Sequence, residues 1–207
     1  MSFNIGTLFG GIDAAIWAIA AIGAAAVFDF FDGASARLLH AYSALGKDLD
    51  SLSDLVSFGV APAMFILNVM LGYSATPWLC FAALLLPVFG ALRLAKFNND
   101  TEQTTSFRGL PIPANAIFWI GMYGWITRYG YPGTGLMVVL ILLLSAAMVA
   151  RFKMFSLKFK NFSLSENFSR YVIILAAVVF VLIYGLSGLA WTILLYLLLS
   201  LLRRKDI

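Results

Sequence analysis

Seven apolar runs of roughly 20 residues each divide most of this chain, and a helix needs about that length to cross a bilayer. Hydrophobic residues make up 62% of the sequence and charged residues only 12%, with a mean hydropathy of +0.93. Such a composition is typical of a polytopic membrane protein. We therefore expect an all-α bundle of about seven transmembrane helices in one integral-membrane domain, residues 1–207. The runs lie at 11–28, 46–71, 76–97, 111–129, 134–151, 169–186 and 188–203, and the last two are joined only by a glycine-containing turn.

Basic residues are concentrated in alternate connections between the runs. Cytoplasmic loops of membrane proteins collect Lys and Arg, so this pattern predicts the N-terminus outside and the C-terminus in the cytoplasm. It also accounts for the net charge of +4 without any nucleic-acid partner. We expect a multi-pass protein of a bacterial inner membrane or plasma membrane. The basic side chains of the predicted cytoplasmic side are Arg37, Lys47, Arg93, Lys96, Arg108, Arg151, Lys153, Lys158, Lys160, Arg170, Arg203, Arg204 and Lys205, whereas Arg128 alone lies near an outer loop.

Four carboxylates stand out within residues 29–54, between two of the apolar runs. Asp29 and Asp32 are three residues apart, and Asp50 and Asp54 are four apart. Residues at these spacings share one face of a helix. An ionisable side chain at membrane depth costs about 3 kcal/mol, so a cluster of them indicates a functional site. Two helices joined by a short turn would point the four carboxylates at one another.

Facing carboxylates need a compensating positive charge, because neighbouring like charges disfavour ionisation. A divalent metal ion would supply it, and oxygen ligands alone suit Mg²⁺ or Mn²⁺ better than zinc. The sequence holds one cysteine, Cys80, and one histidine, His40. A disulfide within the chain is therefore excluded, and we expect both residues to have packing roles.

The polar segment resembles a known family signature. Its residues match the pattern D-x2-D-G-x2-A-R-x8-G-x3-D-x3-D of the CDP-alcohol phosphotransferase family without departure. The words GKDLDSLSDLVSFGVAPA, RLAKFN and FRGLPIPANA are similar to the branch that transfers a phosphatidyl group to serine. That branch carries one more apolar helix before the motif, so we expect the first family helix to be missing or shortened here. The matching residues are Asp29, Asp32, Gly33, Ala36, Arg37, Gly46, Asp50 and Asp54.

The resemblance implies a reaction in phospholipid biosynthesis: CDP-diacylglycerol and L-serine give phosphatidylserine and CMP by metal-assisted direct displacement. It implies two divalent ions, Mg²⁺ or Mn²⁺, held by Asp29, Asp32, Asp50 and Asp54. Asp54 would also be the general base that takes the proton of the serine hydroxyl. The family further implies a homodimer, with an active site open to the cytoplasm and reachable by lipid.

The same resemblance implies a nucleotide-binding set next to the metal ligands. Gly33 and Gly46 have no Cβ, so a nucleotide can approach the helix backbone closely. Ala36 would keep this wall low, and Arg37 would pair with phosphate oxygens or hold a carboxylate in place. With Asp29 and Asp50 these residues form the predicted CDP site.

The acceptor pocket is predicted less directly. Because serine carries a carboxylate and an ammonium group, its pocket should offer a cation and an acceptor. Our candidates are Arg93, Asn98, Ser106 and Arg108. Two alternatives stay open: another acceptor with the same donor, namely glycerol 3-phosphate, inositol or inositol phosphate, and a divalent-cation transport protein. The gathering of the aspartates at one side of the membrane and the presence of Arg37 weigh against a cation path.

Overall fold

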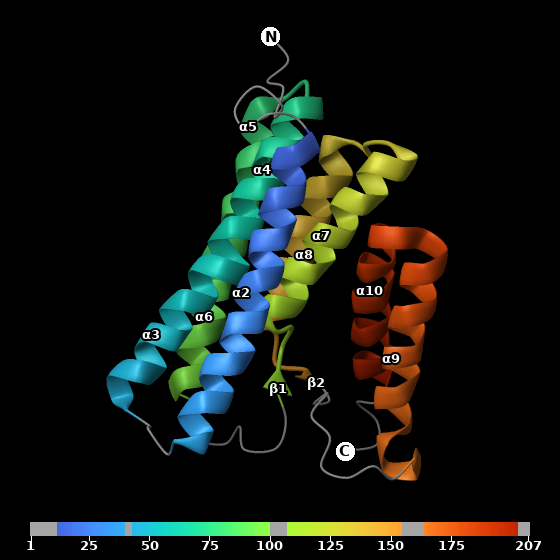
Figure 1. Cartoon of the computed structure of the whole chain (residues 1–207). Coiled ribbons are helices and arrows are strands. Elements are labelled where there is room, and N and C mark those ends of the chain that lie inside the picture. The colour runs from blue at the N-terminus through green and yellow to red at the C-terminus, as the bar shows by residue number, and fades with distance from the viewer. Residues whose placement is uncertain (1–11, 40–42, 100–106, 155–163, 203–207) are drawn as a thin grey trace.

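The computed structural model describes residues 12–39, 43–99, 107–154 and 164–202. Within these ranges the chain is an all-helical bundle whose only extended elements are two strands of two residues each (Figure 1). Its composition and helix lengths fit a multi-pass membrane protein. Four helical segments are long and apolar enough to cross a membrane: Ala15–Ser35, Leu45–Tyr73, Pro77–Asn99 and Arg170–Leu202. The count of seven spans stays a prediction.

The first two helices carry the acidic motif. Helix α2 (Ile12–Leu38) is followed by α3 (Ala44–Asp54), which runs back alongside it (Figure 1). Ser43 begins α3 because its extended backbone lets the side-chain oxygen accept a hydrogen bond from the Gly46 N–H, at 2.9 Å. This N-cap satisfies one of the free amides of the first turn. It fixes where α3 starts, and hence which residues of α3 face α2.

Helix α3 continues without a break through a wider turn. The π-helical turn η1 (Leu55–Val60) leads into α4 (Ala61–Tyr73). Pro62 has no N–H to donate to the carbonyl one turn earlier, and the Ala61 N–H instead reaches back five residues to the Val56 carbonyl. Such π turns occur often at functional sites. Here the turn begins directly after Asp54.

The core lies among the central helices. A continuous helical rod is formed by α5 (Pro77–Cys80), the 3₁₀ turn η2 (Phe81–Leu84) and α6 (Leu85–Asn99). Two further helices follow it, α7 (Ile112–Tyr129) and α8 (Thr134–Val149). Trp119 is fully buried, and its indole N–H donates to Asn115 Oδ1 at 3.1 Å, so its one polar group is satisfied. Other large side chains that are buried in this core are Phe118, Ile66, Met70 and Leu86.

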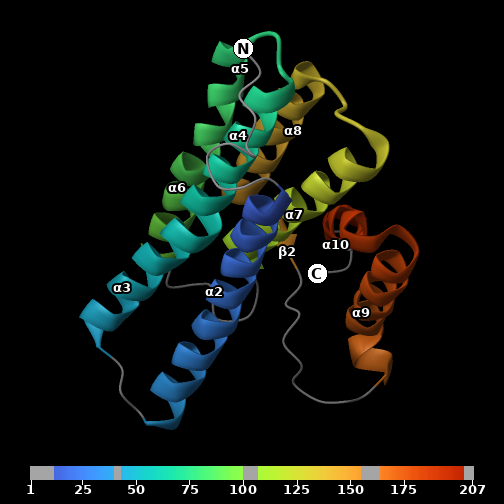
Figure 2. The same ribbon diagram turned by 45° about the horizontal axis from the view of Figure 1, so that its top comes forward.

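The C-terminal helices form a hairpin on one side of the bundle (Figure 2). It consists of α9 (Leu164–Tyr184), the turn η3 (Gly185–Ser187) and α10 (Gly188–Leu202), with the predicted glycine in its turn. Helix α7 lies very close to this hairpin. A Cβ added at Gly121 of α7 would be only 2.2 Å from the Ala190 amide nitrogen of α10. Small residues permit such backbone contacts between membrane helices. The hairpin therefore docks through α10.

Polar and charged side chains lie together at one end of the bundle, which we call the polar end. It holds the carboxyl end of α2, the amino end of α3, the carboxyl end of α6 and the antiparallel strands β1 (Phe107–Arg108) and β2 (Lys153–Met154) (Figure 1). Lys47 Nζ donates to the Asn98 carbonyl at 3.1 Å, and Lys96 Nζ to the Val149 carbonyl at 3.4 Å. Each lysine thus donates to a carbonyl at the carboxyl end of a helix, α6 or α8. Its positive charge also interacts favourably with the negative end of that helix's dipole.

Candidate active site

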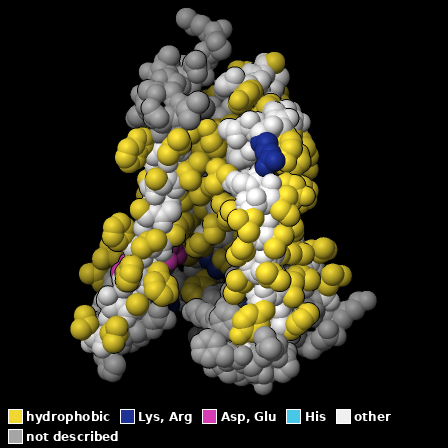
Figure 3. All heavy atoms as spheres, turned by 45° about the vertical axis from the view of Figure 1, so that its right-hand side comes forward, with side chains coloured by type: hydrophobic (Ala, Val, Ile, Leu, Met, Phe, Trp, Pro, Cys, Tyr) yellow, Lys and Arg dark blue, Asp and Glu magenta, His cyan; other side chains and the backbone are white. Residues whose placement is uncertain are grey.

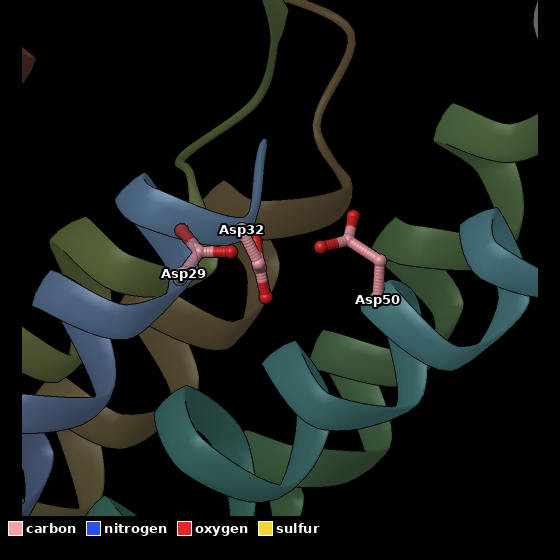
Figure 4. Close-up of side chains that lie close together, drawn as sticks. All are labelled: Asp29, Asp32 and Asp50. Carbon is pink, nitrogen blue, oxygen red and sulfur yellow. The ribbon is translucent and has the colours of Figure 1, made fainter. Parts of the chain in front are cut away.

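Three aspartates from two helices meet at the polar end (Figure 4). Asp29 and Asp32 project from α2, and Asp50 faces them from α3. One carboxylate oxygen of each residue lies within 4.8 Å of the others. Asp29 is half-buried, whereas Asp32 and Asp50 are exposed. The helical spacing predicted from sequence therefore does bring these carboxylates together.

Asp54 joins this group one turn further along α3. It shares the face of α3 that carries Asp50, because the two are four residues apart. Its carboxylate interacts at close range with Asp29 and electrostatically with Asp50 as well. Asp54 is half-buried and lies deeper in the bundle than the exposed Asp50. We call Asp29, Asp32, Asp50 and Asp54 the aspartate cluster.

The donor set of the aspartate cluster fits a hard divalent cation. All its ligand atoms are carboxylate oxygens, which Mg²⁺ and Mn²⁺ accept. In the described part of the chain, none of the four carboxylates forms an ion pair with a basic side chain. Mutual repulsion within the cluster is therefore not relieved by a direct cationic neighbour among those residues, and a bound metal would relieve it.

The two glycines of the motif have different surroundings. A Cβ added at Gly33 would meet no atom within 4 Å, so the helix surface beside Asp32 is open. A Cβ added at Gly46 would lie 2.9 Å from Ser43 Oγ, the N-cap oxygen. Gly46 therefore also makes room for the start of α3. Ala36 and Arg37 belong to the last turns of α2, and their side chains lie outside the described part.

Comparison of its sequence with known proteins assigns the chain to a family. The sequence model of the CDP-alcohol phosphatidyltransferase family matches residues 2–202, nearly the whole chain. The chain belongs to that family.

Relatives within the CDP-alcohol phosphatidyltransferase family include three bacterial proteins named CDP-diacylglycerol–serine O-phosphatidyltransferase. The Helicobacter pylori protein is 31% identical over 186 residues, which cover 87% of this chain and 76% of the relative. The Mycobacterium leprae protein is 42% identical over 55% of this chain and 39% of its own length. The Bacillus subtilis protein is 47% identical over 41% of this chain and 48% of its own. The chain thus spans less than half the length of the last two.

Among the described acceptor candidates, Arg93 is the one that interacts electrostatically with the aspartate cluster of this CDP-alcohol phosphatidyltransferase family member. It projects from α6 and is only 9% exposed. Its guanidinium interacts electrostatically with Asp54 and with Tyr196 of α10, and lies 5.9 Å from the centroid of the Phe97 ring. Among the described residues, its Nε has no hydrogen-bond partner. Acidic and basic side chains are visible inside the hollow of the face shown in Figure 3.

The other acceptor candidates have different positions. Asn98, at the end of α6, is half-buried and donates through Nδ2 to Ser51 Oγ at 2.9 Å. Its amide therefore ties α6 to α3 beside Asp50. Ser106 lies outside the described residues, and Arg108 lies in β1 with its side chain outside the described part.

Tyr196 was not among the site residues predicted from the sequence. It lies in the apolar run LLYLLLS of α10 and is 4% exposed. From there it interacts electrostatically with Arg93 of α6. A lone tyrosine in such a run is typical of a packing residue. Only the docking of the C-terminal hairpin brings it near the motif, and no spacing within the sequence encodes that contact.

Proposed function

We propose that this chain transfers the phosphatidyl group of CDP-diacylglycerol to L-serine, giving phosphatidylserine and CMP. The observation that carries the proposal is the aspartate cluster, which two helices assemble at the polar end of an apolar bundle. The names of the three relatives described above support the choice of donor and acceptor. The expected activity is that of an integral-membrane transferase in phospholipid biosynthesis.

In this proposal, Asp29, Asp32, Asp50 and Asp54 hold two divalent ions, Mg²⁺ or Mn²⁺. The three carboxylates that lie within 4.8 Å of one another support this assignment, as does the contact of Asp54 with Asp29. When bound, two such ions neutralise the negative charge of the diphosphate and stabilise both the attacking and the leaving oxygen.

Asp54 is the proposed general base. It takes the proton from the serine hydroxyl, whose oxygen forms a bond to the phosphorus of the phosphatidyl group. The bond from that phosphorus to the CMP oxygen breaks, and CMP leaves with the electron pair. Asp54 suits this role because it is the deepest member of the cluster and the one that interacts with Arg93. A general base contributes about 10²- to 10⁴-fold to a rate.

The donor nucleotide is proposed to lie along the open surface at Gly33. The absence of any atom within 4 Å of a Cβ built there supports this placement, since a ring or ribose would fit against the backbone. The proposed nucleotide-binding set is Asp29, Gly33, Ala36, Arg37, Gly46 and Asp50. Arg93 is the proposed cation for the serine carboxylate, and Asn98, Ser106 and Arg108 stay candidate acceptor residues.

The membrane arrangement completes the proposal. We place the polar end in the cytoplasm, with about seven spans and a homodimeric state, in a bacterial inner membrane or plasma membrane. Lys47, Lys96 and Lys153 lie in elements of the polar end, whereas Arg128 lies near the far end of α7, which supports this orientation. The lipid donor would then meet cytoplasmic serine at the aspartate cluster.

A direct test measures CMP release from CDP-diacylglycerol by the purified chain with Mn²⁺ or Mg²⁺. Serine, glycerol 3-phosphate, inositol and inositol phosphate are offered in separate reactions. We expect turnover with serine alone, and loss of it when EDTA removes the metal. Turnover only with another acceptor would overturn the serine assignment, and folded protein that is silent with all four would overturn the transferase proposal.

A further inference from the structure

We propose that α10 forms one wall of the acceptor pocket, where Tyr196 and Ser200 join Arg93 in binding the carboxylate of the acceptor amino acid. The inference rests on the proposed serine transfer and adds the residues that select the acceptor. It assigns a function to the C-terminal hairpin, which carries no residue of the family signature.

The first observation concerns the Nε of the buried Arg93 guanidinium. Arg93 is nine-tenths buried, yet its Nε has no hydrogen-bond partner in the described part of the chain. It interacts electrostatically with Asp54 but forms no ion pair with it there. A buried cationic donor without a partner is costly, so an anion that binds between α6 and α10 would be favoured.

The second observation is the polar face of α10. Tyr196 is 4% exposed and interacts electrostatically with Arg93. Ser200 follows one turn later on the same face, is 1% exposed, and its Oγ has no hydrogen-bond partner among the described residues. Thr192, one turn before Tyr196, is buried on the same face, but its hydroxyl donates to the Gly188 carbonyl at 2.9 Å. Ser200 therefore adds a hydroxyl without a described partner to the face of α10 whose Tyr196 interacts with Arg93.

The chemistry of these groups selects a carboxylate. A guanidinium with hydroxyl donors beside it matches a carboxylate, whose two oxygens accept several hydrogen bonds. In serine the hydroxyl and the carboxylate are only a few bonds apart. Arg93 interacts electrostatically with Asp54, and no ion pair joins them among the described residues. In the proposed arrangement, one serine molecule gives its hydroxyl to Asp54 and its carboxylate to Arg93. A phosphorylated acceptor would place a doubly charged group in the same position.

The test compares Tyr196→Phe and Ser200→Ala with the full-length parent chain. For each we would measure kcat, the KM for L-serine and the KM for CDP-diacylglycerol. Losing one hydrogen bond to a charged group weakens binding by about tenfold or more. We expect the KM for serine to rise by about that factor in each variant, with kcat and the KM for CDP-diacylglycerol within about twofold of the parent.

Ser145→Ala is the matched control, because Ser145 also has a buried Oγ without a described partner but lies on α8. It should leave the KM for serine unchanged, and Tyr123→Phe on α7 controls for loss of a tyrosine hydroxyl elsewhere. An unchanged KM for serine in both α10 variants would overturn this inference. The proposed function would still stand in that case, provided that the parent chain turns over serine. A parent that uses inositol phosphate but not serine would overturn both, and a fall confined to kcat would overturn the carboxylate role.

Discussion

Asp54 combines two properties that the proposed metal-assisted transfer requires of its general base. It contacts Asp29 within the aspartate cluster, and it is the cluster member that interacts with Arg93. It therefore lies between the proposed metal site and the proposed acceptor. An amide in its place keeps one oxygen for a metal but cannot take a proton.

The variant Asp54→Asn should accordingly bind metal and lose turnover. We expect kcat to fall by about 100-fold or more, the scale of a missing general base. Binding of Mn²⁺, followed by electron paramagnetic resonance, should weaken far less than it does in Asp29→Asn, which removes a charge from the centre of the cluster. A variant that releases CMP at a near-normal rate would contradict the role of Asp54 as base.

Gly33 tests the nucleotide surface. The variant Gly33→Leu places a large side chain where no atom lies within 4 Å, so the fold should tolerate it while the proposed CDP site is filled. We expect the Kd for CDP-diacylglycerol, measured in detergent, to rise by about tenfold or more, equivalent to about 1.4 kcal/mol. Gly23→Leu is the control on the same helix, since Gly23 is equally open but lies ten residues before Gly33. Equal affinity in both variants would remove Gly33 from the nucleotide site.

The docking of α10 against α7 depends on glycines. Gly121 faces the Ala190 amide nitrogen, and Gly124 faces the Ser187 amide nitrogen, at 2.2 and 2.6 Å from where their Cβ atoms would lie. Both contacts are with backbone, which cannot move as an isolated side chain can. These two positions therefore hold the hairpin that carries Tyr196.

The variant Gly121→Leu should loosen this contact. Overpacking typically costs about 1–3 kcal/mol, so we expect a lower Tm in detergent and a higher KM for serine. Gly135→Leu on α8, where no atom lies within 4 Å, should leave both quantities unchanged. If Gly121→Leu melted at the Tm of the parent, the close approach of α7 and α10 would not stabilise the fold.

Sequence alone was sufficient for the all-helical class and for the meeting of Asp29, Asp32 and Asp50. Apolar runs anticipated the helices, and the three- and four-residue steps of the aspartates anticipated their meeting, because both depend on local periodicity. The π turn after Asp54 was not anticipated. It depends on the hydrogen bond from the Ala61 N–H to the Val56 carbonyl, next to Pro62, and the sequence alone does not show which carbonyl that N–H reaches. The bond from Asn98 to Ser51 and the approach of Tyr196 to Arg93 were missed because they join distant segments.

At the scale of the whole molecule, the proposed serine transfer requires the polar end to face the compartment that supplies serine. The end that carries the aspartate cluster also carries Lys47 and Lys96, which satisfy helix carbonyls there. Cytoplasmic ends of membrane proteins collect lysines, which favours the proposed orientation. The connection between α4 and α5 lies at the opposite end of the same rods (Figure 1).

Cysteine labelling of intact cells can test this orientation. Cys80 is fully buried and is replaced by Ala, after which Ala75→Cys and Asn99→Cys each provide one exposed thiol at opposite ends of the rod from α5 to α6. A membrane-impermeant maleimide should label Ala75→Cys in intact cells, and Asn99→Cys only after lysis. Because the two sites are 24 residues apart along one helical rod, the bilayer must separate them if the rod spans it. Labelling of Asn99→Cys in intact cells would place the aspartate cluster outside, away from cytoplasmic serine.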